Sequence, residues 1–130
     1  MNTHEKATLV FTREKLDELF PLERSDAFFD ALYGDAAEGA YDIRLAFRAV
    51  EPKTLHFAFE LHQRPGKCLA CNLTYGLPQV FARHPLINLK GLAAQLSGLV
   101  GWNAEEISYA LGRTEESSSE LHLIPLRIQR

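Results

Sequence analysis

The sequence predicts an α+β fold in which a small antiparallel sheet packs on one face against helices from both ends of the chain. Residues 41–50 and 54–64 alternate apolar and polar side chains on either side of a Pro-containing turn, which is typical of a β-hairpin. Residues 120–128 form a third β-prone run, and apolar stripes with helical spacing flank the hairpin. With 130 residues, 46% of them hydrophobic, the chain is expected to form a single domain, 1–130, around its own core.

The segment before the hairpin is expected to hold two helices. Thr12 can cap a helix over 13–20, and Ser25 can cap a second helix over 26–33. Both have apolar side chains at i, i+3 and i+4, which would face the sheet. Residues 7–11 are apolar and β-prone, so we interpret them as an additional strand.

The hairpin is expected to have one apolar and one polar face. The apolar face takes alternate residues from Tyr41 to Ala49 in the first strand and from Leu55 to Leu61 in the second. The polar face is expected to contact solvent or a partner, because antiparallel sheets often pack on one side only.

Behind the hairpin the sequence predicts three helices, over 78–83, 89–100 and 105–111. Asn88 can cap the second of them. A polar loop over 113–119 precedes the last strand. Pro125 interrupts the alternation of that strand, which favours a bulge or an edge position because proline cannot donate a ladder hydrogen bond.

The net charge of −3 conceals an uneven distribution. Residues 1–42 carry a net charge of −6, residues 43–104 carry +5 and residues 105–130 carry −2. Either the acidic helices pack beside the basic sheet and reduce each other's field, or the middle third presents an anion-binding face. Nucleic-acid-binding domains are usually more basic overall, so a nucleic-acid partner is not expected.

The two cysteines, Cys68 and Cys71, form a C-x-x-C motif. Two intervening residues let both sulfurs face one point, which suits a zinc ion or a reversible disulfide. A tetrahedral zinc site needs two more ligands, and His62 and His84 are the nearest histidines in the sequence. A site shared between two subunits would instead use two thiolates from each chain. Two reduced thiols buried as small apolar groups are the remaining alternative.

The polar face of the hairpin is a second candidate site. Four of its side chains combine cations with a carboxylate and an imidazole, namely Arg44, Arg48, His56 and Glu60. A cross-strand polar network would explain them, and a site for a small anion or another ligand is the alternative.

Three stretches resemble blocks in small, uncharacterised bacterial proteins of about this length. They are Glu23–Phe29, Gly39–Arg44 and the segment His62–Phe81, which reads HQRPGKCLACNLTYGLPQVF. Some of those proteins carry a homeobox-type name, but this chain has no basic recognition helix with an asparagine among arginines and lysines. The resemblance covers most of the chain and implies neither an activity nor site residues.

The N-terminus is polar, and no apolar tract reaches the length that spans a bilayer, so we expect a cytoplasmic protein without a membrane partner. The leading hypothesis is a non-catalytic binding or assembly domain, with a homodimer as one arrangement and the cysteine loop as its distinctive surface. The first alternative is a thiol-redox or zinc-binding protein that uses Cys68 and Cys71, with zinc as its cofactor. The second is binding of a small anion or ligand on the basic hairpin face.

Overall fold

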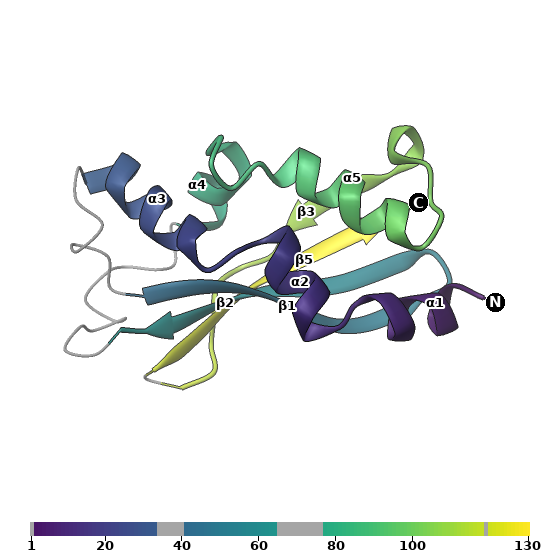
Figure 1. Cartoon of the computed structure of the whole chain (residues 1–130), viewed down its shortest axis with the longest axis horizontal. Coiled ribbons are helices and arrows are strands. Elements are labelled where there is room, and N and C mark those ends of the chain that lie inside the picture. The colour runs from purple at the N-terminus through teal and green to yellow at the C-terminus, as the bar shows by residue number, and fades with distance from the viewer. Residues whose placement is uncertain (1, 34–40, 65–76, 119) are drawn as a thin grey trace.

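The computed structural model describes residues 2–33, 41–64, 77–118 and 120–130, and it confirms the α+β class (Figure 1). The helices are α1 (Thr3–Val10), α2 (Arg13–Leu19), α3 (Glu23–Tyr33), α4 (Leu77–Arg83), α5 (Leu89–Leu99) and the short 3-10 helix η4 (Ala104–Glu106). The strands are β1 (Tyr41–Glu51), β2 (Thr54–Gln63), β3 (Ser108–Leu111), β4 (Glu115–Glu116) and β5 (Leu121–Gln129).

The strands form one antiparallel sheet in the order β1-β2-β5-β3, with β4 also paired to β5. The predicted edge position at Pro125 is wrong because β5 lies inside the sheet, and the predicted bulge is wrong because the register of β5 with β2 runs unbroken past Pro125. The Pro125 carbonyl accepts a hydrogen bond from the Gly112 N–H at 2.8 Å. The nitrogen and the carbonyl of one residue face the same neighbour in an antiparallel strand, so the proline nitrogen faces the gap between β3 and β4. A Cβ on Gly112 would lie only 3.3 Å from Pro125 Cγ, which favours glycine at this close approach.

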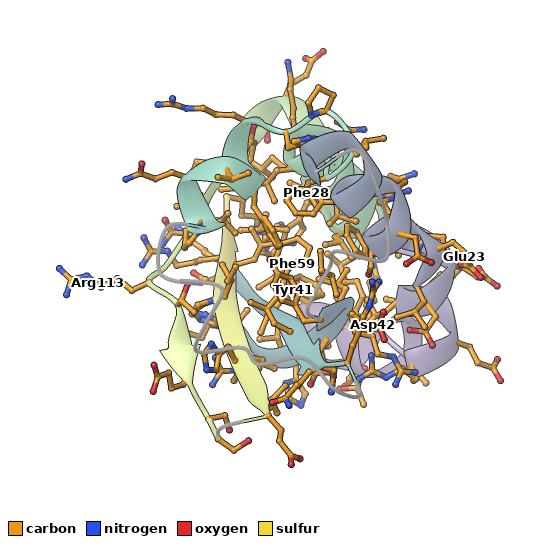
Figure 2. The ribbon with its side chains drawn as sticks, turned by 90° about the vertical axis from the view of Figure 1, so that its left-hand side faces the viewer. Glu23, Phe28, Tyr41, Asp42, Phe59 and Arg113 are labelled. Carbon is orange, nitrogen blue, oxygen red and sulfur yellow. The ribbon has the colours of Figure 1, made fainter. Side chains whose placement is uncertain are left out.

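The core lies between the inner face of the sheet and the helices. On the inner face of the sheet, nine apolar side chains are at most 1% exposed, namely Ile43, Leu45, Leu55, Phe57, Phe59, Leu61, Ile124, Leu126 and Ile128. The ring of Phe59 meets Phe20 of the α2 C-cap and Phe81 of α4, each at 5.4 Å between centroids. Phe28 of α3 meets Phe81 at the same distance, and Figure 2 shows Phe28, Phe59 and Tyr41 in the centre of the molecule. Aromatic edge-to-face contacts thus join three helical segments to β2.

Side chains from α2 and α3 cover the outer edge of β1. The Ser25 hydroxyl accepts from the Ile43 N–H at 2.7 Å and donates to the Ile43 carbonyl at 3.3 Å. The Arg13 guanidinium donates to the Leu45 carbonyl at 3.0 Å. Ser25 was predicted to cap a helix beginning at residue 26, but α3 begins at Glu23. The Ser25 hydroxyl instead forms hydrogen bonds with the backbone of β1.

Two predicted elements are wrong. Residues 7–11 are not a strand, because α1 spans Thr3–Val10 and the Asn2 side chain caps it by accepting from the Glu5 N–H. Residues 105–111 are not a helix, because η4 ends at Glu106 and β3 follows. The expected loop over 113–119 contains β4.

A β-bulge changes the face of the last residues of β1. Phe47 pairs with Phe57, but Ala49 pairs with His56, so Arg48 is the extra residue. Ala49 was predicted on the apolar face, and the structure leaves it exposed, while Val50 packs against the core. The bulge therefore reverses the alternation after Phe47.

Among the described residues, no helix is both long enough and apolar enough to cross a bilayer.

Candidate functional site

The sheet has an outer face, opposite the core, which none of the described helices covers. Figures 1 and 2 show the helices on the inner side of the sheet and along the β1 edge. Strand alternation and register place on the outer face Asp42, Arg44, Ala46 and Arg48 of β1, His56, Ala58, Glu60 and His62 of β2, and Leu121, Leu123, Pro125 and Arg127 of β5. Most of the candidate residues therefore share one surface.

At one end of the outer face, the hairpin meets α2 in a network of charges. The Arg44 guanidinium donates to both carboxylate oxygens of Asp17, from Nε at 3.3 Å and from Nη2 at 3.0 Å. This hydrogen bonding lowers the pKa of Asp17 below its ordinary value of 3.8. Arg13 also lies near Asp17, at 3.8 Å, and near Glu60, at 3.4 Å. Arg44 of the basic middle third therefore forms an ion pair with Asp17 of the acidic first third.

The same network extends along the hairpin to Arg64. Its guanidinium contacts Asp26 of α3 at 2.7 Å and Asp42 of β1 at 3.0 Å. His62 Nε2 lies 3.0 Å from Glu60 Oε1. These contacts support the expectation that acidic helices pack beside the basic sheet and reduce its field.

An acid-lined cavity of about 370 Å³ opens beside this network. It is lined by Asp17, Pro21, Leu22, Glu23, Asp42, Arg44 and His62. Figure 2 shows Glu23 and Asp42 away from the central aromatic residues, on the side of the molecule where α2 and α3 lie. In the cavity and its ion-pair network, the carboxylates of Asp17, Glu23, Asp26, Asp42 and Glu60 outnumber the guanidinium groups of Arg13, Arg44 and Arg64. This end of the outer face therefore carries excess negative charge.

At the other end of the outer face, three basic side chains form what we call the basic row, Arg48, His56 and Arg127. Arg48, the extra residue of the bulge, lines one hollow together with His56, and the register pairs His56 with Arg127. His56 and Pro125 line both hollows at this end, one of about 360 Å³ with Arg48 and one of about 220 Å³ with Arg127. The basic row thus crosses three neighbouring strands.

The ion pairs of the basic row are long and exposed. Arg48 Nη1 lies 3.7 Å from Glu115 on β4, and the two side chains are 44% and 51% exposed. His56 Nε2 lies 3.5 Å from Glu51, which is 65% exposed. Arg127 has no ion pair with any other residue that the structure describes. Such pairs contribute little to stability, so an incoming anion can displace them at low cost.

The predicted hairpin candidates fall into these two groups. Arg44 pairs directly with Glu60 across the hairpin, at the acidic end. Arg48 and His56 lie in the basic row, about 14 Å away along the strand at roughly 3.4 Å per residue.

The histidines proposed as zinc ligands do not converge. His62 is on the outer face, whereas His84 contacts Phe28 on the helical side of the sheet, at 4.9 Å between rings. His84 Nδ1 accepts from the Leu86 N–H at 3.2 Å, which favours a loop-capping role, since a metal-bound imidazole normally donates from its second nitrogen. Cys68 and Cys71 lie outside the described residues, and no group of three or more metal-ligating side chains occurs within them.

Sequence reasoning missed Arg127 and the acids of the cavity. Arg127 neighbours His56 only through the pairing of β5 with β2, which links residues far apart in the chain. Asp17 belongs to no motif that the sequence reveals. The only available signal was the opposite charge of the first and middle thirds of the chain.

No family model, no curated protein and no solved structure matches this chain.

Proposed function

We propose that this protein is a non-catalytic cytoplasmic binding domain that holds a carboxylate-bearing partner against the basic row of its outer face. The observation that carries the proposal is that Arg48, the extra residue of the β1 bulge, lines one hollow together with His56, which in turn pairs with Arg127. Bulges often redirect a side chain at a functional site.

The chemistry of the row suits binding rather than catalysis. A guanidinium offers a planar set of donors that matches a carboxylate, and it stays protonated at all ordinary pH values. Arg48 and Arg127 can therefore bind negative charge without taking part in proton transfer. His56 adds one further donor between them, and the hollows on either side leave room for a side chain.

Titration of the isotope-labelled protein with a capped tetraglutamate peptide tests this proposal. Amide resonances of Arg48, His56 and Arg127 should shift on binding. Arg127→Gln should weaken binding about tenfold, because a charge-assisted hydrogen bond contributes roughly 1.5–3 kcal/mol. The same change at Arg83, an exposed arginine of α4 on the helical side, is the matched control. Equal weakening by both variants, or no binding, would refute the proposal.

A second candidate function rests on the spacing of Cys68 and Cys71. Because His62 and His84 lie on opposite sides of the sheet, the remaining zinc arrangement takes two thiolates from each of two chains. Metal analysis of protein purified without added zinc tests it. A stoichiometric metal that Cys68→Ser removes would support zinc binding. Absence of metal together with unreactive thiols in the native protein would exclude both the zinc and the redox function.

A further inference from the structure

We infer that the carboxylate-bearing partner is a second copy of this chain, whose acid-lined cavity faces the basic row across a two-fold axis. The inference rests on the proposed function and names the partner of the same site. It follows from the excess of carboxylates at one end of the outer face, from the loosely held arginines at the other end, and from the residues between them.

The two ends occupy matching positions. His56 in the basic row and His62 in the cavity lie on the same strand, six residues apart in the register, or about 20 Å at roughly 3.4 Å per residue. Arg48 and Asp42 are likewise both on β1. A two-fold axis that lies parallel to the face and perpendicular to the strands would therefore set the basic row of each copy over the cavity of the other.

The charges at the two ends complement each other. Glu23 lines the cavity and has no ion pair with any other described residue, as Arg127 has none in the basic row. Both are exposed. Each copy thus offers one end with excess acid and one end with loosely held cations, and the two-fold axis brings unlike ends together twice.

The middle of the outer face permits close approach. Ala46 and Ala58 pair across the hairpin, and Pro125 lies beside Ala58 on β5. Ala58 is only 1% exposed, so Ala46 and Pro125 supply the accessible surface at this point. Leu123, the next outward residue of β5, is also apolar and half-buried. Small and apolar side chains between charged ends resemble the arrangement of a protein interface, in which an apolar centre is surrounded by a polar rim.

Two charge-reversal variants test the inference, when their dimerisation is measured separately and then in an equimolar mixture. Wild-type protein should give a dimer mass in sedimentation at micromolar concentration, and salt should weaken the dimer because its contacts are charged. Arg48→Glu and Glu23→Lys should each raise the dimer Kd at least about 100-fold, since each places like charges together at both symmetry-related contacts. An equimolar mixture should dimerise again, because one contact is native and the other joins the reversed glutamate to the reversed lysine.

Arg83→Glu is the control for charge reversal away from the outer face and should leave the dimer unchanged. Circular dichroism checks that each variant is folded. A monomeric wild type, dimers that survive either reversal, or a mixture that stays monomeric would each overturn the inference.

The Glu23→Lys variant separates the inference from the proposed function. It should be monomeric, yet its basic row is intact, so it should bind the tetraglutamate peptide. Peptide binding with a monomeric wild type would leave the proposed function standing and remove the inference. A variant that binds no peptide would remove both.

Discussion

Replacing Ser25 with alanine is expected to destabilise the protein by about 2 kcal/mol. Ser25 is fully buried, and its hydroxyl is the partner of the Ile43 N–H at the edge of β1. A buried N–H left without a partner costs roughly 1–3 kcal/mol. Loss of the longer hydrogen bond to the Ile43 carbonyl, at 3.3 Å, adds little to this destabilisation. The higher helix propensity of alanine offsets at most about 0.5 kcal/mol of it.

Urea unfolding followed by the fluorescence of Trp102, the single tryptophan, measures this loss. The midpoint should fall while the slope stays constant, since the surface exposed on unfolding is unchanged.

Ser97→Ala is the matched control for this prediction. Ser97 is equally buried in a helix, but its hydroxyl donates to the Ala93 carbonyl of that same helix, at 2.6 Å. Its loss leaves no sheet amide unpaired and should cost less than about 1 kcal/mol. If Ser25→Ala cost no more than Ser97→Ala, the assigned role of Ser25 at the β1 edge would be incorrect.

Three further predictions concern the charge network and the core. The hydrogen bond from Arg44 is the main cause that lowers the pKa of Asp17 in the folded protein. Ionised Asp17 therefore stabilises the fold fully above the unfolded-state pKa of 3.8, and this stabilisation is lost as the pH falls through the lower folded-state pKa. Asp17→Asn should therefore be less stable by under about 1 kcal/mol at neutral pH, and a series of urea titrations should show the difference shrink as the pH falls below about 4 and vanish below the folded pKa of Asp17. Phe59→Ala should cost about 3–5 kcal/mol in the same assay, because Phe59 is fully buried against two other rings. Trp102→Phe should change stability by less than about 1 kcal/mol by circular dichroism, because the buried indole N–H has no hydrogen-bond partner among the described residues.

Sequence periodicity predicted the hairpin because both strands alternate over eight or more consecutive residues, and it predicted the third long strand because residues 121–128 are mostly apolar despite the interruption at Pro125. It failed where the pattern was short or locally interrupted. Residues 107, 109 and 111 are apolar at every second position and form a strand, but the acidic pair before them was interpreted as a helix start. In the first segment, Ala7 and Phe11 have helical spacing, but the run 7–11 is too short to distinguish a helix from a strand.

The candidate site was predictable in part. The polar face of the hairpin follows from alternation, so Arg44, Arg48 and His56 were identified from sequence. The division into an acidic end and a basic end depends on which helix packs beside β1 and which strand pairs with β2. Both are long-range contacts that no local pattern encodes. The bulge at Arg48 has the same character, because no proline or glycine marks it.

The covered edge of β1 limits how this protein can polymerise. An uncovered edge strand offers its free amides and carbonyls to another molecule, and sheets that add strands in this way grow without limit into fibres. On β1 the positions that such a strand would use at Ile43 and Leu45 are already bonded to Ser25 and Arg13. On the opposite side of β5, the described part of the chain places only the short strands β3 and β4, separated at Pro125. Self-association through the face of the sheet, in contrast, closes on itself after two copies.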